Sequence, residues 1–217
     1  ADGLRSQIRK QMLGRRPPRF TGAVAWRGLA PAEAAPDLPQ AAIVWAGPGR
    51  HAVTYRVRRG ALINFVGVIE QQTWREEGWA HSGDRADLAG FFADWADPLP
   101  RIVARLGSVN RWALFDRDPL PTWSDRRVVL LGDACHPMPP FQAQGAAMAI
   151  EDAVVLARKL ADAKGAPEAA LKAYEAARKP RTSRVLASAR SNMAVFHRAN
   201  PLAQAATYGP MRVADRL

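Results

Sequence analysis

The sequence predicts a mixed α/β (α+β) protein in which a mainly antiparallel β-sheet is inserted between helical and α/β segments. Three observations support this fold class. Five segments between residues 20 and 116 alternate β-branched or aromatic residues with period two, a continuous apolar run follows them, and alanine-rich helical segments come last. With 217 residues, 48% of them hydrophobic, the chain can bury a substantial core.

The first segment, residues 1–19, predicts a short helix. Its apolar residues Leu4, Ile8 and Met12 recur every four positions. Gly14 and the Pro-Pro pair that follows end this pattern, because glycine and proline both interrupt helices.

Residues 20–116 predict the sheet. The expected strands are residues 20–29, 41–47, 51–58, 61–70 and 111–116. Residues 84–106 read as helix, with a break at Pro98. This mixture indicates an antiparallel sheet that carries one or two helices on one face.

Residues 117–217 return to an α/β pattern. Residues 127–133 form a short apolar run that is typical of a strand buried on both faces. Gly145 then opens a helix whose predicted apolar stripe consists of Ile150, Ala153, Val154, Ala157 and Leu160. Further helices are expected at residues 167–179 and 184–196, with Pro180 interrupting them.

The formal net charge of +11 raises the question of nucleic-acid binding. The basic residues gather at Arg5, Arg9, Lys10, Arg15, Arg16 and Arg19, and again between residues 158 and 190. They are not interleaved with aromatic residues, and no helix-turn-helix, RRM or zinc-finger pattern accompanies them, so we expect no nucleic-acid partner. A positive field that attracts small anions or a phosphate-bearing cofactor fits the charge as well.

The remaining composition argues against membrane, disulfide and metal roles. No stretch approaches the roughly 18 consecutive apolar residues of a membrane span, and the first ten residues lack the apolar region of a signal peptide. The single Cys135 cannot form an internal disulfide, so we expect a cytoplasmic location. The histidines at positions 51, 81, 136 and 197 are widely scattered, and no metal site is predicted.

The segment from Gly132 to Ala153 has the composition of a ligand-binding corner. Asp133 ends the predicted strand, where a carboxylate can accept hydrogen bonds from a polyol. A proline-rich loop follows, and Gly145 then allows close approach of backbone to a ligand at the positive end of a helix. An ordinary strand-loop-helix turn with an Asp cap explains the same spacing, so both interpretations stay open.

A set of residues at fixed spacing carries a family resemblance. The set is Gly132-Asp133, His136-Pro137, Pro140, Gln144-Gly145 and Glu151-Asp152-Ala153. It resembles the second flavin motif of the FAD-dependent aromatic hydroxylases, the single-component flavoprotein monooxygenases related to p-hydroxybenzoate hydroxylase, and is most similar to their salicylate-hydroxylase-like branch. Ala143 stands where the family's usual GQG has its first glycine. The start of the chain resembles the family's Asp-Gly motif, DGxxSxxR, through Asp2, Gly3, Ser6 and Arg9.

The resemblance implies a domain organisation. Residues 1–19 would belong to an incomplete, Rossmann-like FAD-binding domain, residues 20–116 would form an inserted substrate-binding domain, and residues 117–217 would return to the FAD-binding domain and end in helices. The family opens with a βαβ unit bearing GxGxxG, and this chain contains no GxGxxG. We therefore expect a later portion of a longer enzyme, with a missing N-terminal segment as one partner. A homodimer is also compatible with the sequence.

FAD is the implied cofactor, with NADH or NADPH as the reductant. The implied cofactor-binding residues are Asp2, Gly3, Arg9, Gly132, Asp133, Gln144, Gly145, Ala146 and Ala147. Asp133 would bind the ribityl chain, and the N–H groups that begin at Gly145 would face the pyrimidine edge of the flavin. Asp2 and Gly3 would lie near the dinucleotide, and Pro140 would lie beside the reactive flavin carbon, where its carbonyl helps to orient the substrate.

His51 and Tyr55 are the candidate substrate residues. Residues four apart on a strand share a face, about 13 Å apart along it. In the salicylate-like branch a similar H-x-x-x-Y pair meets the substrate, with the His as the base that deprotonates a phenol and the Tyr orienting it. Two half-buried residues on an amphipathic strand are the alternative. Trp26, Trp45 and Phe65 either line the same pocket or belong to the core.

The implied activity is hydroxylation of a small aromatic substrate, phenolic or carboxylated, with NAD(P)H and O2 through a flavin C4a-hydroperoxide. One alternative is a flavin oxidoreductase of the same fold that acts on a non-phenolic substrate. Another is a non-catalytic fragment or basic binding module that holds no flavin.

Overall fold

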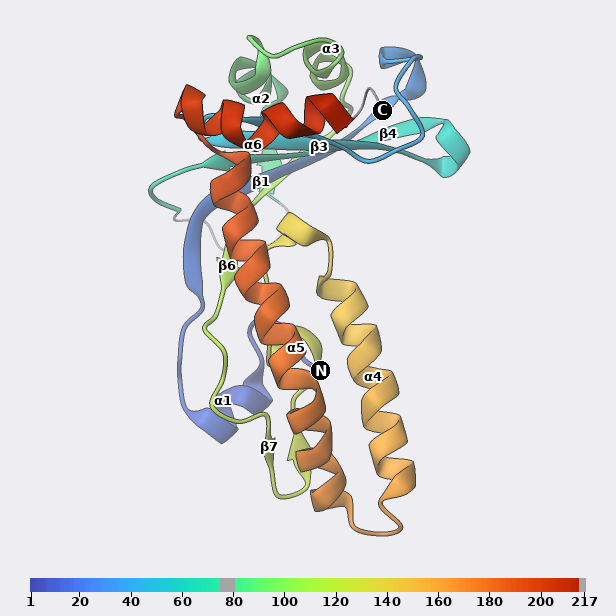
Figure 1. The fold of residues 1–217 in the computed structure, drawn as a ribbon, viewed down its shortest axis with the longest axis vertical. Coiled ribbons are helices and arrows are strands. Elements are labelled where there is room, and N and C mark those ends of the chain that lie inside the picture. The colour runs from blue at the N-terminus through green and yellow to red at the C-terminus, as the bar shows by residue number, and fades with distance from the viewer. Residues whose placement is uncertain (75–80, 215–217) are drawn as a thin grey trace. The chain divides into compact units, whose positions relative to one another are not determined.

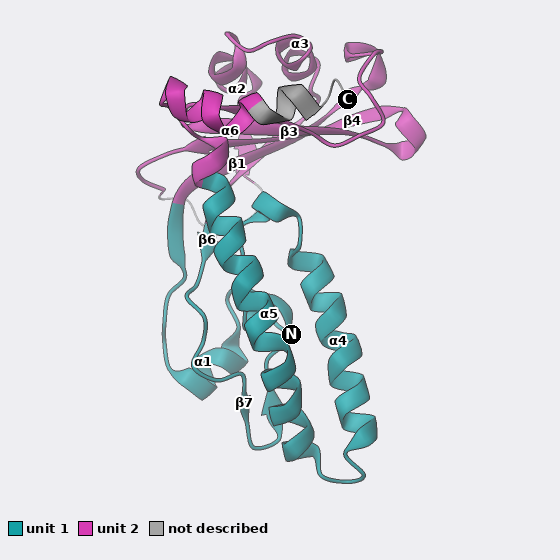
Figure 2. Ribbon diagram, viewed as in Figure 1, with its two compact units in different colours: residues 1–21, 115–193 teal, residues 22–114, 194–217 magenta. Residues whose placement is uncertain are grey.

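A computed structural model describes residues 1–74 and 81–214 (Figure 1). The chain forms two compact units (Figure 2). One consists of Ala1–Thr21 and Phe115–Met193, and the other of Gly22–Leu114 and Ala194–Leu217. The sequence pattern placed residues 117–217 together, whereas contacts group the last segment with the sheet. In the described part of the chain, no helix has the length and apolar character needed to cross a membrane.

The sheet unit contains the antiparallel sheet that the sequence predicts. Its strands are β1 (Arg19–Pro31), β2 (Ile43–Gly47), β3 (Arg50–Val57), β4 (Leu62–Glu70), β5 (His81–Gly83) and β6 (Val109–Asp116), and their spatial order is β2-β3-β4-β1-β6-β5. The β2–β3, β3–β4, β1–β4 and β5–β6 pairs are antiparallel. All five expected strands are present, and the three-residue β5 was not anticipated.

Helices cover one face of this sheet. The expected helical region forms α2 (Arg85–Phe92) and α3 (Leu99–Ala104), and the Asp97–Pro98 peptide before α3 is cis. The rings of Phe65 and Phe92 meet edge to face at 5.5 Å, and those of Trp26 and Phe91 lie 6.3 Å apart. The strand register puts Trp45 on this face too. These three strand aromatics therefore lie on the helix-covered face of the sheet, where Trp26 and Phe65 are buried in the core and Trp45 is half-buried.

The other unit is built mainly from helices. It contains α1 (Gln7–Leu13), the two-residue strands β7 (Ser124–Asp125) and β8 (Val128–Val129), α4 (Gly145–Asp162) and most of α5 (Pro167–Phe196). The last helix, α6 (Pro201–Ala214), belongs to the sheet unit. Figure 1 shows α4 and α5 side by side. The buried cluster beneath them consists of Leu120, Trp123, Leu130, Ala134, Cys135 and Tyr174.

The strand expected at residues 127–133 is wrong in extent and burial. The strand β8 spans only Val128–Val129, and it pairs with β7 alone among the described residues. The Val128 side chain is 43% exposed. A strand needs a neighbouring ladder to continue, and the chain instead turns at Gly132, whose φ is +62°.

The predicted apolar stripe of α4 is also wrong as a buried face. Ile150 is 67% exposed and Val154 is 45% exposed, whereas Met148 and Asp152 are fully buried. Periodicity ranks faces by their hydrophobicity, but ion pairs that Asp152 makes with α5 fix which side of α4 turns inward.

Pro180 does not interrupt α5, which continues from Pro167 to Phe196. Proline in a helix interior costs about 3 kcal/mol. Buried contacts hold the helix on both sides of it: Arg178 forms ion pairs with α4, and the Thr182 hydroxyl donates to the carbonyl of Arg178 at 3.3 Å. This anchoring explains why the helix persists.

The packing of α2 on the sheet predicts a contrast between two glycines. A Cβ on Gly67 would lie 2.9 Å from Phe65 and 3.1 Å from Phe92, whereas a Cβ on Gly90 would meet nothing within 4 Å. We expect Gly67→Ala to lower the free energy of unfolding by about 1–3 kcal/mol through overpacking. The matched Gly90→Ala change in α2 should raise it by about 0.5–1 kcal/mol. Urea unfolding measures both, and equal effects would contradict this packing.

Candidate functional site

The Asp-Gly motif forms the start of α1. The Asp2 carboxylate accepts hydrogen bonds from the N–H groups of Gln7 at 2.7 Å and Ile8 at 3.1 Å. Partial desolvation raises the pKa of Asp2, but hydrogen bonds from Ser6 and these N–H groups outweigh it and hold the pKa below its ordinary value. Gly3 adopts a φ of +76° and its carbonyl accepts from the Ser6 N–H at 3.0 Å. The motif therefore gives the chain an ordered, negatively charged helix cap.

Arg9 joins the Asp-Gly motif to the Gly-Asp motif. Its side chain is buried, and its guanidinium donates to the carbonyl of Ala134 at 2.8 Å and to that of Leu4 at 2.7 Å. Ala134 directly follows Asp133, so one side chain connects segments 125 residues apart. Burial lowers the pKa of Arg9 from its ordinary value. Arg9 was expected among the cofactor-binding residues, and in this structure its visible contacts position the two motifs.

Gly132 and Asp133 lie in a tight turn, Gly132–Ala134, at the end of the apolar run. The positive φ of Gly132 and the 3.3 Å approach that a Cβ would make to Ala149 both favour glycine. The Gly132 carbonyl accepts from the N–H of His136 at 3.0 Å, which closes the turn. Asp133 is exposed at its apex. A carboxylate in this position is accessible to hydroxyl groups of a ligand.

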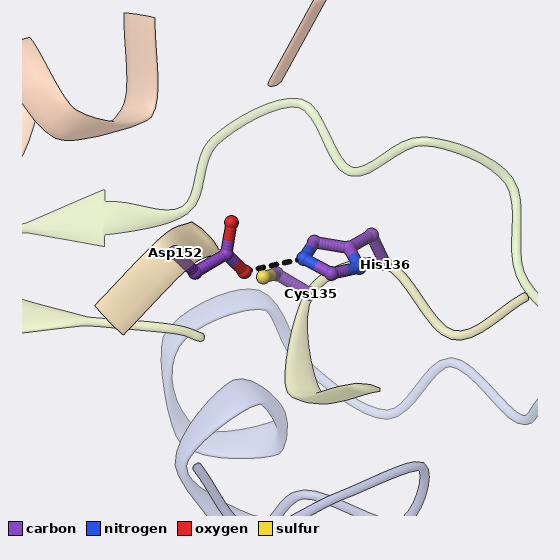
Figure 3. Close-up of side chains that lie close together, drawn as sticks. All are labelled: Cys135, His136 and Asp152. Carbon is purple, nitrogen blue, oxygen red and sulfur yellow. Dashed lines mark hydrogen bonds and ion pairs between the residues drawn. The ribbon is translucent and has the colours of Figure 1, made fainter. Parts of the chain in front are cut away.

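Asp152 holds this turn from α4 (Figure 3). Its fully buried carboxylate accepts from the N–H of Gly132 at 3.1 Å, contacts His136 Nε2 at 2.5 Å and pairs with Arg178 Nε at 2.7 Å. Burial raises the pKa of Asp152, but hydrogen bonds from His136 and Arg178 outweigh it, so the pKa lies below its ordinary value. His136 is therefore a structural hydrogen-bond partner, as the sequence suggested.

Glu151 extends the ion pairs toward the surface. Arg178 Nη1 lies 2.6 Å from Glu151, and Arg181 reaches the same carboxylate at 2.7 and 2.8 Å. The hydrogen bond from Arg181, opposed by slight desolvation and aided by Arg178, lowers the pKa of Glu151 to about 2. The sequence motif includes Glu151 and Asp152, but the arginines of α5 gave no signal because they follow 26 or more residues later.

Cys135, His136 and Asp152 bring three potential metal-ligand atoms within 4.8 Å of one another (Figure 3). The Asp152 oxygens already accept from two N–H groups and from Arg178, which places a cation beside them. Burial raises the pKa of the Cys135 thiol, which donates to the Gly132 carbonyl at 3.3 Å. A protonated thiol and a neighbouring guanidinium both disfavour a metal ion, so this cluster is a structural ion-pair network.

The N-terminus of α4 presents backbone donors. Within the described part of the chain, the side chain of Gln144, the N-cap residue, makes no capping hydrogen bond. A Cβ on Gly145 would meet only Met138, at 3.9 Å. Ala146 is exposed and Ala147 is half-buried. The first N–H groups of this 18-residue helix therefore suit an electron-rich group, which the positive helix end stabilises.

The loop before α4 is rigid. Pro140 is exposed and its carbonyl accepts from the N–H of Ala143 at 2.9 Å. Ala143 adopts the left-handed conformation, with φ 52° and ψ 28°. Glycine reaches this conformation without strain, which explains why the family pattern has glycine there. The alanine keeps the same turn at a conformational cost.

His51 and Tyr55 lie on the sheet face opposite the aromatic layer. His51 is only 2% exposed, and its Nδ1 lies 2.6 Å from His197 Nε2. Burial, with a smaller contribution from His197, lowers the pKa of His51 to about 3, so the ring is neutral at neutral pH. Tyr55 is half-buried and pairs across the ladder with Asn64, whose side chain accepts from Arg27 at 3.0 Å. Only Tyr55 fits the half-buried alternative.

Sequence reasoning missed the partners of His51. His197 follows α5, and its Nδ1 lies 2.8 Å from Glu70 Oε1 at the end of β4. The backbone N–H of Gly49 donates to the His197 carbonyl at 3.3 Å, which fixes the segment against the sheet. The Phe196 ring packs on His51 at 5.1 Å. Separations of 127 and 146 residues left no local pattern to find.

The turn at Gly132 and the open N-terminus of α4 lie in one compact unit, which suits a nucleotide-type cofactor. The chain matches the FAD binding domain family over residues 1–189 and belongs to that family.

Relatives of known activity and known structure agree with this assignment. The chain is 37% identical to 3-amino-4-hydroxybenzoate 2-monooxygenase PtnB3 of Streptomyces platensis, over 100% of this chain and 55% of that protein. It superposes on a salicylate hydroxylase substrate complex with a TM-score of 0.82 and 28% identity, covering 93% and 55% of the two chains. HpxO of Klebsiella pneumoniae, complexed with FAD and uric acid, gives 0.84 and 32%, with coverage of 98% and 54%. The chain spans about half the length of these proteins.

The ion pairs of Asp152 predict a large effect of one isosteric change. Asp152→Asn removes the buried carboxylate partner of Arg178 and leaves it only the partly exposed Glu151, so we expect the free energy of unfolding to fall by about 3–5 kcal/mol. Asp125→Asn, at an exposed position of β7, is the matched control and should change it by less than about 0.5 kcal/mol. Because the pKa values of Asp152 and Glu151 are depressed in the folded state, their contribution is present above about pH 4 and is lost as the pH falls toward 2. Urea unfolding across this range measures both effects, and an unchanged acid limb in Asp152→Asn would contradict them.

Proposed function

We propose that this chain supplies the flavin-ring and substrate-binding residues of an FAD-dependent aromatic hydroxylase that uses NAD(P)H and O2. The observation that carries the proposal is the exposed Asp133 carboxylate, fixed by the Asp152 network in the same unit as the uncapped N-terminus of α4. The family match over residues 1–189 supports the cofactor. The activities named for the relatives support the reaction class.

The residues present fit FAD. Asp133 is free to accept hydrogen bonds from ribityl hydroxyls, and the N–H groups of Gly145, Ala146 and Ala147 suit the pyrimidine edge of the ring, where reduction adds negative charge. When bound, FAD supplies hydride acceptance from NAD(P)H and activation of O2. The role of the chain is to orient the ring and to stabilise its charge. Asp2, Gly3 and Gln144 complete the proposed cofactor set, with Arg9 and Gly132 holding its geometry.

His51 is the proposed base. Its neutral ring can accept the proton of a phenol, which converts the substrate into a more electron-rich phenolate. Tyr55 shares its strand face and is proposed to orient the same substrate. Pro140 is proposed to direct a carbonyl toward the substrate from the rigid loop before α4.

A second candidate function has its own support. HpxO, at 32% identity, is described in complex with uric acid, which is not a phenol. A flavin oxidoreductase that acts on a non-phenolic heterocycle would use the same cofactor residues. Turnover of such a compound, without turnover of phenols, would favour it over the aromatic hydroxylase.

Three further proposals concern the whole protein: its location, an additional N-terminal segment and its oligomeric state. We propose a cytoplasmic enzyme, on the ground of its single buried Cys135. A further N-terminal segment is proposed to supply the rest of the dinucleotide site, because the relatives are about twice as long as this chain. Association as a homodimer is a separate proposal, and gel filtration at two concentrations tests it.

Removing the Asp133 carboxylate should weaken FAD binding. We expect Asp133→Ala to raise the Kd for FAD at least about 10-fold, because hydrogen bonds to a charged group contribute about 1.5–3 kcal/mol. Asp125→Ala removes an exposed carboxylate of the same unit and should leave the Kd unchanged. Quenching of flavin fluorescence during titration, in the longest natural chain that contains these residues, measures the Kd. Equal affinities for the two variants would refute the site, and absence of binding by the unaltered protein would refute the proposed function.

Removing the His51 ring should affect turnover and not cofactor binding. We expect His51→Ala to lower kcat/KM for a phenolic substrate about 10²–10⁴-fold, which is the usual contribution of a general base. Tyr55→Phe should mainly raise KM. The visible spectrum of bound flavin is the control in both variants. Equal loss of flavin and of hydroxylation in His51→Ala would show that His51 is structural.

A further inference from the structure

The described sheet ends at β2, and the outer side of this strand presents backbone donors and acceptors. β2 is the outermost strand in the order β2-β3-β4-β1-β6-β5. Gly47 and Arg50 pair across the two-residue turn that joins β2 to β3, so they form a hydrogen-bonded pair. Because such pairs alternate along an antiparallel ladder, the N–H and C=O groups of Val44 and Ala46 point away from β3. These groups form an open edge in the described part of the chain.

This edge lacks the features that normally keep an outer strand from pairing with another chain. Natural proteins protect such strands with charged side chains, proline, bulges or a covering loop. β2, Ile43–Gly47, contains no proline, and residues 40–49 contain no charged residue, although the formal net charge of the whole chain is +11. The Val44 side chain is 46% exposed, and Ala46 is exposed as well. The edge is therefore neutral, apolar and accessible.

Ion pairs balance the two arginines that line the hollows beside β2. Arg50 Nη2 lies 3.1 Å from Asp94 Oδ1, and the Arg50 guanidinium carbon lies 5.7 Å from the centre of the Trp95 ring. Arg101 Nε lies 3.1 Å from Asp97 Oδ2. Two copies of a basic chain repel each other, so contact between copies is opposed least at an edge whose charges are absent or balanced.

Trp45 makes the edge complementary to itself. Its indole N–H donates to the Thr54 hydroxyl at 2.9 Å, which fixes the ring. Trp45 borders two hollows, one of about 680 Å³ that Trp95 also lines and one of about 270 Å³ beside Pro98. If two antiparallel copies of β2 pair about a two-fold axis at Trp45, the two Trp45 side chains become direct cross-strand neighbours on one face. The hollows leave room for the second ring.

We propose that the chain associates with a second copy of itself through β2. In this arrangement the N–H of Val44 donates to the Ala46 carbonyl of the second copy, the N–H of that Ala46 donates back to the Val44 carbonyl, and the two sheets become continuous. The inference names the surface of the homodimer that is part of the proposed function, and it rests on that part alone, not on FAD binding or turnover. A strand of a different protein is the other occupant that such an edge can accept, and the experiments separate the two.

The first test is a proline at Val44 in the 217-residue chain. Val44→Pro removes an N–H that points away from β3, and an outer strand accepts proline at such a position. Val44→Thr keeps the N–H and a β-branched side chain, so it is the matched control. We expect Val44→Pro to raise the Kd of the dimer at least about 10-fold, because a carbonyl of each partner loses its donor. Sedimentation velocity over a concentration series measures the Kd, and circular dichroism checks the fold.

The second test needs no substitution. Amide hydrogen exchange of the unaltered chain is followed by NMR at concentrations below and above the Kd. We expect the N–H groups of Val44 and Ala46 to exchange at least about 10-fold more slowly in the dimer, because pairing removes them from water. The N–H of Trp45 points to β3, so its exchange should change much less and serves as the internal control.

The outcomes distinguish the interface from the homodimer and from the enzyme activity. A chain that stays monomeric at every concentration overturns both the homodimer and its interface, and leaves the edge to a strand of a different protein. A dimer in which Val44 and Ala46 exchange as fast as in the monomer, or which a folded Val44→Pro variant forms with unchanged Kd, overturns the interface alone. Neither result bears on FAD binding, which the titration of Asp133→Ala measures separately.

Discussion

The buried carboxylate of Asp152 is the constraint on which the cofactor-binding unit depends. Removing a carboxylate from water costs several kcal/mol, and the cost is offset only when its oxygens are fully hydrogen-bonded. The donors come from three places in the chain: the Gly132 N–H, the His136 ring and the Arg178 guanidinium. One group therefore sets the Gly-Asp turn, the roll of α4 and the position of α5 at once. Asp133 owes its exposed place to this arrangement, since the turn cannot rotate it inward without breaking the bond at Gly132.

In the sheet unit, strand β3 carries side chains on two faces of the sheet that have different surroundings. On β3 the alternation of side chains sends Thr54 toward the layer that contains Trp45, whose indole N–H donates to the Thr54 hydroxyl at 2.9 Å. The neighbouring positions His51 and Tyr55 point to the other face. Aromatic packing thus stabilises the strand from one side, and the proposed substrate residues lie on the other side. The segment with His197 then covers that second face and completes the surroundings of His51.

Patterns in the local sequence predicted the features that depend on residues close together in the chain. Period-two alternation located the strands of the sheet. The spacing from Gly132 to Asp152 located the Gly-Asp turn and α4, which the hydrogen bond from Gly132 to Asp152 joins in the structure. The apolar run before Gly132 and the stripe with Ile150 failed because burial depends on neighbours that the periodicity does not contain. The arginine partners of α4 and the partners of His51 were invisible for a further reason. The paired residues are 26 to 146 positions apart in the sequence. Nothing in the neighbouring sequence distinguishes these Arg, His and Glu residues from others on helices and at strand ends.

The burial of His51 constrains its proposed role as a base. A histidine whose pKa has fallen to about 3 holds a proton poorly, so an isolated ring of this kind would be a weak base for a phenol. The same burial keeps the ring neutral and oriented at neutral pH, which is the state that accepts a proton. The hydrogen bonds that join His51 to His197, and His197 to the half-exposed Glu70, fix the orientation of both buried rings. Burial therefore favours the neutral, oriented form of His51 and at the same time limits its strength as a base.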